Sequence, residues 1–169
     1  MAFVDEGSSF TLVEEDLADE LGLDGPNQPL HLQWTGGITR VEKRSRVVTL
    51  KISGTPQGHQ YTLSGVKTVQ KLELPAQTLD SEVLQSKYRH LRGVRLEPYT
   101  NERPKLLIGI GHLQVGLVLK CREGTANDPV AVKSRLGWTV CGGADKVHNV
   151  AAVQSRSNES HKSDDNGGR

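Results

Sequence analysis

Residues 3–23 read Phe-Val-Asp-Glu-Gly-Ser-Ser-Phe-Thr-Leu-Val-Glu-Glu-Asp-Leu-Ala-Asp-Glu-Leu-Gly-Leu. A short apolar lead ends at an acid, Asp5, which is followed by a turn that contains Gly7. Further along, Leu17 and Leu21 are spaced to share one face of a helix. The stretch is therefore predicted to present one carboxylate on a tight loop ahead of a helix.

The ends of that predicted helix carry recognisable signals. Thr11 and Glu14 have the spacing of a capping box, in which two side chains satisfy free backbone N–H groups at a helix start. Gly22 suits the left-handed conformation that often ends a helix. We expect the acid to lie ahead of a well-anchored element.

The Asp-x-Gly triplet at Asp5 is compatible with the chemistry of an aspartyl hydrolase. Such an enzyme places two carboxylates close enough to share a proton, so that one activates water and the other protonates the substrate carbonyl. Because the triplet supplies one carboxylate, the second would come most simply from another copy of the chain across a two-fold axis. Asp-x-Gly-Ser is also an ordinary turn sequence, and the residues alone favour that simpler interpretation.

Length and charge limit the classes of protein that fit. At 169 residues the chain is long enough for one domain with a hydrophobic core. Its 21 basic residues against 20 acidic ones give a formal charge of +1, so no overall basic field attracts nucleic acid.

Cysteine usage and hydropathy indicate the compartment. Cys121 and Cys141 lie in apolar, strand-like contexts without metal-site spacing, and we predict buried free thiols in a reducing environment. The chain has no apolar run of about 18 residues and no basic leader before an apolar core. We expect a soluble, cytoplasmic protein without a membrane partner.

The middle of the chain alternates apolar and polar residues, as half-buried strands do. We predict strands over 30–34, 41–52 and 59–69 that form a meander, with a bulge or bend at Gly65. The paired glycines in residues 35–39 predict a flexible hairpin tip.

A helix is predicted over residues 80–88, with Asp80 as its N-cap. A basic cluster follows, made of Lys87, Arg89, His90, Arg92 and Arg95. It is interpreted as a solvated face, because the aromatic residues that stack on nucleic-acid bases are scarce; nucleic-acid binding is the alternative.

The last third of the chain is predicted to contain strands over 105–113, 115–121 and 130–141. Residues 144–169 are rich in polar residues and glycine, so a disordered tail is expected to follow an ordered domain over residues 1–143. The six histidines lack the spacing of a metal site, and neither a metal nor a cofactor is predicted.

The order of these features resembles the retropepsin-like aspartic proteases, and most closely the peptidase domain of Bel/Pao-type retrotransposon polyproteins. The resemblance is carried by residues 4–13, 17–23, 35–37 and 105–109, and by Pro-Val-Ala-Val-Lys-Ser-Arg-Leu-Gly-Trp at 129–138. It implies a mostly β fold with a closed, barrel-like sheet and one or two short helices. It also implies a homodimer that cuts peptide bonds, chiefly in its own polyprotein, and that needs no cofactor.

The resemblance assigns roles by position. Asp5 corresponds to the catalytic aspartate, and the catalytic loop continues through Glu6, Gly7 and Ser8. Leu107, Ile108 and Gly109 correspond to the strand end that packs behind this loop. The flap that closes over a bound peptide corresponds to Trp34, Thr35, Gly36, Gly37 and Ile38.

Two features depart from the family pattern. Glu6 replaces the usual Ser or Thr, and in a dimer it would crowd four carboxylates unless it faces outward or activity is confined to acidic conditions. Only residues 1–4 precede Asp5, whereas the family has a strand and hairpin there, so a domain truncated at its N-terminus is expected. The alternative function is therefore a catalytically inactive fragment that acts as a peptide-binding or interaction module.

Overall fold

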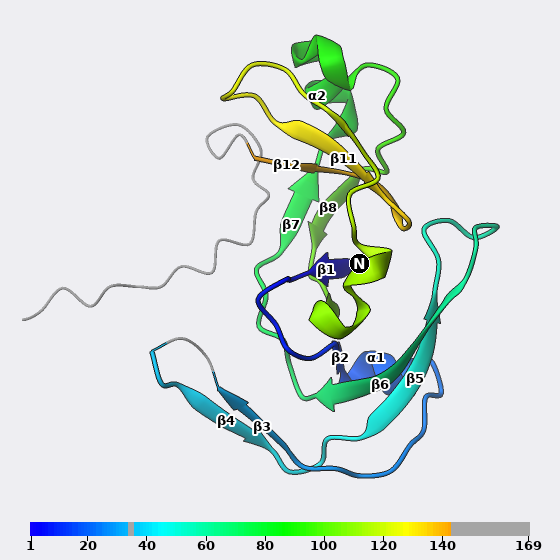
Figure 1. Cartoon of the computed structure of the whole chain (residues 1–169), viewed down its shortest axis with the longest axis vertical. Helices are drawn as coiled ribbons and strands as arrows, with labels where there is room; N and C mark the ends of the chain where they lie inside the picture. The colour runs from blue at the N-terminus through cyan, green and yellow to red at the C-terminus, as the bar shows by residue number, and fades with distance from the viewer. Residues whose placement is uncertain (34–35, 143–169) are drawn as a thin grey trace, which may run out of the picture.

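The structure is a computed structural model that describes residues 1–33 and 36–142 (Figure 1). It is mostly β. The strands are β1 (Ala2–Val4), β2 (Leu12–Glu14), β3 (Leu30–Gln33), β4 (Thr39–Glu42), β5 (Val47–Ile52), β6 (Tyr61–Val69), β7 (Gln77–Leu79), β8 (Tyr99–Glu102), β9 (Leu106–Ile108), β10 (Lys120–Arg122), β11 (Val130–Ser134) and β12 (Gly137–Cys141). The helices are α1 (Glu15–Glu20) and α2 (Ser81–Lys87), with the 3-10 segments η1 (Arg89–Leu91) and η2 (Ile110–Val115).

The main sheet has five strands in the order β1-β9-β2-β6-β5. Strand β9 comes from late in the chain, yet it lies between β1 and β2, parallel to β1 and antiparallel to β2. All three residues of β9 are buried apolar side chains, as expected for a strand with neighbours on both edges. The loop that joins β1 to β2 must therefore pass over the end of β9.

Three hydrophobic clusters hold the elements together. The first packs helix α1 and the β5–β6 hairpin against the main sheet, through residues that include Val13, Ala18 and Leu63. Another joins Leu30 and Leu32 of the β3–β4 hairpin to residues of the main sheet. A third lies among α2, η1, β7, β11 and β12, which are seen above the main sheet in Figure 1.

Several local predictions are confirmed. The side chain of Asp80 accepts a hydrogen bond from the backbone N–H of Val83, 3.0 Å away, and caps helix α2. Gly22 follows α1 with a positive φ of 63°. Gly65 has a φ of 74°, and the register between β5 and β6 shifts beside it, as predicted for a bulge.

Other predictions about the elements are wrong. The described strands form four separate sheets instead of one closed, barrel-like sheet, and β3–β4 is a sheet of its own instead of part of a meander. The expected strand over 115–121 is confirmed only at its end, where Lys120 and Cys121 belong to β10. Val115 ends η2 and residues 116–119 form a turn and loop, because Gly116 interrupts the apolar pattern, and Leu117, Val118 and Leu119 are exposed. The predicted strand over 105–113 is shortened to β9.

The cysteine prediction is partly wrong. Cys121 and Cys141 are free, but both are exposed instead of buried. They lie on β10 and β12, in the three-stranded sheet on either side of β11, where apolar sequence neighbours do not ensure burial. The predicted tail, residues 144–169, lies outside the described residues.

In the described part of the chain, no helix has the length and apolar character needed to cross a membrane.

Candidate active site

Asp5 lies directly after β1, where the chain leaves the main sheet. Its backbone N–H donates to the carbonyl of Ile108 at 2.9 Å, which extends the pairing of β1 with β9 by one residue. The side chain is half-buried. The sheet therefore places the carboxylate at a defined position beside the C-terminal end of β9.

The loop after Asp5 orients its carboxylate. The backbone N–H of Gly7 donates to Asp5 Oδ1 at 2.9 Å, and the N–H of Ser8 donates to the Asp5 carbonyl at 3.2 Å. None of the ion pairs among the described residues involves Asp5. One oxygen is thus held by the backbone, and the group is available to accept a hydrogen bond from water or from a ligand.

The back of the loop packs tightly on the end of β9. The N–H of Ile110 donates to the Ser8 carbonyl at 2.9 Å. A Cβ atom on Gly109 would lie 2.2 Å from the carbonyl oxygen of Phe10 and 2.7 Å from that of Ser8. Only glycine allows the backbones to approach so closely.

Thr11 connects the loop to β9 and η2, a role that the sequence did not indicate. Its side chain is 5% exposed, and its Oγ1 accepts from the N–H of Gly109 at 3.1 Å. The same oxygen lies 2.8 Å from Nδ1 of His112. The predicted capping box is wrong, because Glu14 is the N-cap residue of α1 and neither it nor Thr11 makes a side-chain cap.

The remaining residues of the predicted loop and strand lie around this centre. Glu6 and Gly7 are exposed, whereas Ser8 is half-buried and its hydroxyl donates to the Phe10 carbonyl at 2.8 Å. Ile108 is fully buried below the loop in the first cluster. Leu107 points to the cluster that holds the base of the β3–β4 hairpin, so one strand supports both the loop and the hairpin.

The predicted flap is the tip of the β3–β4 hairpin. Gly36 and Gly37 have positive φ values of 87° and 77°, and the side chain of Ile38 is 66% exposed. Trp34 and Thr35 lie outside the described residues. Among the described residues, no hydrogen bond joins Gly36, Gly37 or Ile38 to the Asp5 loop, and Figure 1 shows the hairpin extending away from the main sheet.

The described residues contain no cluster of side chains that could bind a metal ion. Within residues 1–33 and 36–142, no group of three or more histidine, cysteine or acidic side chains is placed to hold a metal ion. Two hollows are lined by other residues: one by a set that includes Tyr88 and Asp128, the other by a set that includes Asp19 and Arg46. Asp5 is not among the residues that line either hollow.

Comparison of the chain with protein-family models, with curated proteins and with solved structures finds no match.

Proposed function

We propose that the chain is an aspartic endopeptidase domain of the retropepsin-like class, from a retrotransposon polyprotein, that hydrolyses peptide bonds as a homodimer. The observation that supports this most strongly is the insertion of β9 between β1 and β2, with the Asp5 loop folded over its end. That arrangement holds an Asp-x-Gly carboxylate rigidly while leaving it half-exposed. A barrel-like sheet of the retropepsin type would require pairing beyond the strands described.

In the proposed reaction, the Asp5 carboxylates of two copies lie side by side and share one proton. The ionised carboxylate takes a proton from water, whose oxygen attacks the carbonyl carbon of the substrate, while the protonated carboxyl donates to the carbonyl oxygen. The carboxyl that took the proton from water then donates it to the amide nitrogen, and the other carboxylate takes a proton from a hydroxyl of the tetrahedral intermediate. The C–N bond breaks, and the amine and the carboxylic acid leave. The N–H of Gly7 serves to keep Asp5 Oδ1 in place through these steps.

The β3–β4 hairpin would act as the flap. Its base is fixed by Leu30 and Leu32 in the cluster that contains Leu107, whereas its glycine-containing tip is exposed. Closure of such a tip over a peptide would exclude water from the reacting carbonyl. The free cysteines are consistent with a reducing, cytoplasmic location.

Cleavage of a model peptide library by the full chain tests the proposal. Asp5→Asn should abolish cleavage, because an amide cannot act as the base. Asp24→Asn is a matched control, since Asp24 is an exposed loop residue whose carboxylate, like that of Asp5, accepts from a glycine N–H, that of Gly25 at 2.7 Å. Cleavage that persists in Asp5→Asn would refute the assignment. Specific activity that rises with protein concentration would support the dimer.

A binding module without catalysis is the second candidate, and the position of Glu6 favours it. Its exposed carboxylate directly follows Asp5, so a dimer would bring four carboxyl groups together, and their mutual repulsion would oppose association. Sedimentation with and without pepstatin separates the candidates: an inhibitor-stabilised dimer supports the enzyme, and an unresponsive monomer supports the module. If Glu6 confines activity to acid, Glu6→Thr should extend cleavage toward neutral pH.

A further inference from the structure

Positive charge is concentrated in the part of the chain that forms η1 and the sheet of β10, β11 and β12. Residues 77–142, which contain these elements, have ten basic residues against six acidic ones, whereas residues 1–76 have seven against ten. The formal charge of +1 is therefore the sum of two oppositely charged parts. A basic part of this kind attracts polyanions that the overall charge does not predict.

The three-stranded sheet places two lysines in a row with a tryptophan. Lys120 of β10 pairs with Lys133 of β11, which in turn pairs with Trp138 of β12. Residues that oppose each other on neighbouring strands project from the same face. Lys120 is exposed, and Lys133 and Trp138 are half-buried, with Trp138 packed at the margin of the cluster that contains η1. The row therefore lies beside η1 and remains accessible.

Arg122 connects this row to the basic cluster of residues 87–95. Its guanidinium carbon lies 5.8 Å from the centre of the Trp138 ring, a distance at which a cation interacts with the π face. Its Nη1 also donates to the carbonyl of Arg92, the residue that follows η1, at 3.0 Å. The fold thus supplies the basic cluster with an aromatic neighbour that lies more than 40 residues further along the chain.

These cations are not neutralised by acidic side chains in the part of the chain that the structure describes. No ion pair there includes Lys120, Arg122 or Lys133, or a member of the basic cluster. The acid next to Arg122 in the sequence, Glu123, accepts from the thiol of Cys121 at 3.3 Å. Cys121 projects from the opposite face of β10, so this carboxylate does not lie with the row.

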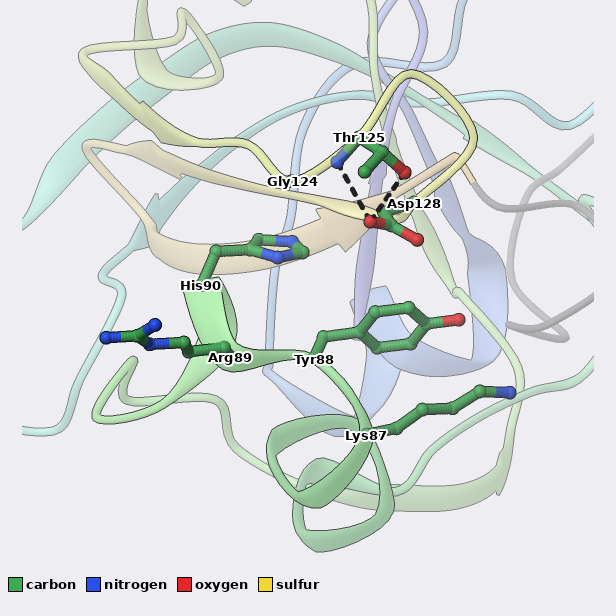
Figure 2. Close-up of a pocket in the computed structure, with 7 residues that line it drawn as sticks. All are labelled: Lys87, Tyr88, Arg89, His90, Gly124, Thr125 and Asp128. Atoms are coloured by element: carbon green, nitrogen blue, oxygen red, sulfur yellow. Dashed lines mark hydrogen bonds between the residues drawn. The ribbon is translucent and has the colours of Figure 1, made fainter.

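The charges of the basic cluster are spread out. Figure 2, a close view of the hollow beside η1, shows the side chains of Lys87 and Arg89 extending in opposite directions on the two sides of Tyr88. Both side chains are exposed. Cations that diverge in this way suit the repeated phosphates of an extended chain better than one small anion.

We propose that the surface formed by η1 and by Lys120, Arg122, Lys133 and Trp138 binds single-stranded nucleic acid. The lysines and arginines contact phosphates, and unpaired bases stack on the indole of Trp138 or on the guanidinium plane of Arg122. Trp138 decides between polyanions, because duplex DNA keeps its bases stacked on one another and an anionic lipid surface has no bases.

Fluorescence anisotropy with a labelled oligothymidylate of about 20 nucleotides tests the charged contacts on the full chain. Changing Lys120 and Lys133 together to glutamine should weaken binding about tenfold. It should also reduce the slope of log affinity against log salt by about 1.4, since each phosphate contact on a single strand contributes about 0.7. The matched control changes Lys43 and Lys51, two exposed lysines in residues 1–76, to glutamine and should alter neither value. Equal losses in the two double variants would overturn the proposal, and so would the absence of binding.

Competition experiments identify the polyanion. The duplex form of the same oligonucleotide should compete at least tenfold more weakly than the unlabelled single strand. Vesicles that contain phosphatidylserine should also compete weakly. A duplex that competes as well as the single strand, or vesicles that displace it fully, would refute the assignment to single-stranded nucleic acid.

The emission of Trp138 tests stacking directly. Trp34→Phe leaves Trp138 as the sole tryptophan, and addition of oligothymidylate should quench its fluorescence. Trp138→Leu, which keeps an apolar side chain at the margin of the cluster, should weaken binding about tenfold, with circular dichroism as the check that it folds. Binding that leaves the emission of Trp138 unchanged would overturn the proposed site, whether or not Trp138→Leu folds.

Discussion

Replacing Gly109 by alanine should destabilise the protein severely through its effect on the Asp5 loop. The added Cβ would lie 2.2 Å from the Phe10 carbonyl oxygen, 2.6 Å from the Phe10 carbonyl carbon and 2.7 Å from the Ser8 carbonyl oxygen. All three are backbone atoms, which cannot rotate away as a side chain can. Reaching an ordinary contact of 3.4 Å from 2.2 Å requires the loop and β9 to separate by 1.2 Å.

The cost of this separation has two parts. Overpacking a close contact costs about 1–3 kcal/mol. The shift also disrupts the hydrogen bonds from Ile110 N–H to Ser8 and from Gly109 N–H to Thr11, each worth about 1 kcal/mol. We therefore expect the free energy of unfolding to fall by about 3–5 kcal/mol, a large part of the roughly 5–15 kcal/mol that is typical of a domain.

Urea unfolding followed by circular dichroism measures this loss, and Gly111→Ala supplies the matched control. A Cβ on Gly111 meets no atom within 4 Å, and its φ is not in the left-handed region. That variant should be neutral or up to about 1 kcal/mol more stable. If Gly109→Ala unfolds within about 1 kcal/mol of the wild type, the close packing of the loop on β9 is wrong.

Three further predictions concern hydrogen bonds and charges. Thr11→Val keeps the shape of the side chain but leaves the buried N–H of Gly109 without an acceptor, so urea unfolding should show a loss of about 1–3 kcal/mol that Thr11→Ser largely avoids. The hydrogen bond from Lys105 lowers the pKa of Asp16 in the folded protein. The ionised Asp16 therefore stabilises the fold above the unfolded pKa of about 3.9, and this stabilisation is lost as the pH falls through the lower folded pKa. The melting temperature of Asp16→Asn should thus be lower than that of the wild type at neutral pH, and the two melting temperatures should converge in acid. A difference in melting temperature that stays constant with pH would contradict the stabilising role of Asp16. The hydrogen bond to Glu123 raises the pKa of the Cys121 thiol, so Glu123→Ala, which removes the acceptor, should speed alkylation of Cys121 by iodoacetamide at pH values near 8. Cys141, whose pKa is raised by partial desolvation of its thiol on the sheet, is the internal control and should react at an unchanged rate.

The features predicted correctly from the sequence depend on neighbours along the chain. The N-cap at Asp80 requires only a side chain and an N–H three residues away. Gly22 and Gly65 mark positions of positive φ, which glycine adopts without the steric penalty of other residues. The Asp-x-Gly turn belongs to this class, because Gly7 donates to the carboxylate two residues before it.

The predictions that failed depended on contacts with residues far away in the sequence. Thr11 has a capping-box spacing, but its hydroxyl bonds to Gly109 and His112 instead, because burial between the loop and η2 leaves no access to the helix start. Cys121 and Cys141 have apolar sequence neighbours, yet their side chains lie on the exposed face of a three-stranded sheet. Neither outcome could be judged without knowing which strands pair.

The amino-acid sequence by itself determined the position of the Asp5 carboxylate on its turn, the start of helix α2 and the glycines with positive φ. Each of these features depends on residues within a few positions along the chain. Only the tertiary structure decided that β9 enters between β1 and β2 and that Thr11 meets a histidine 101 residues away. The physical reason is that such contacts form only when the burial of distant apolar strands outweighs the entropy of closing a long loop. That balance of free energies depends on all the strands together, so it cannot be predicted from a short stretch of residues.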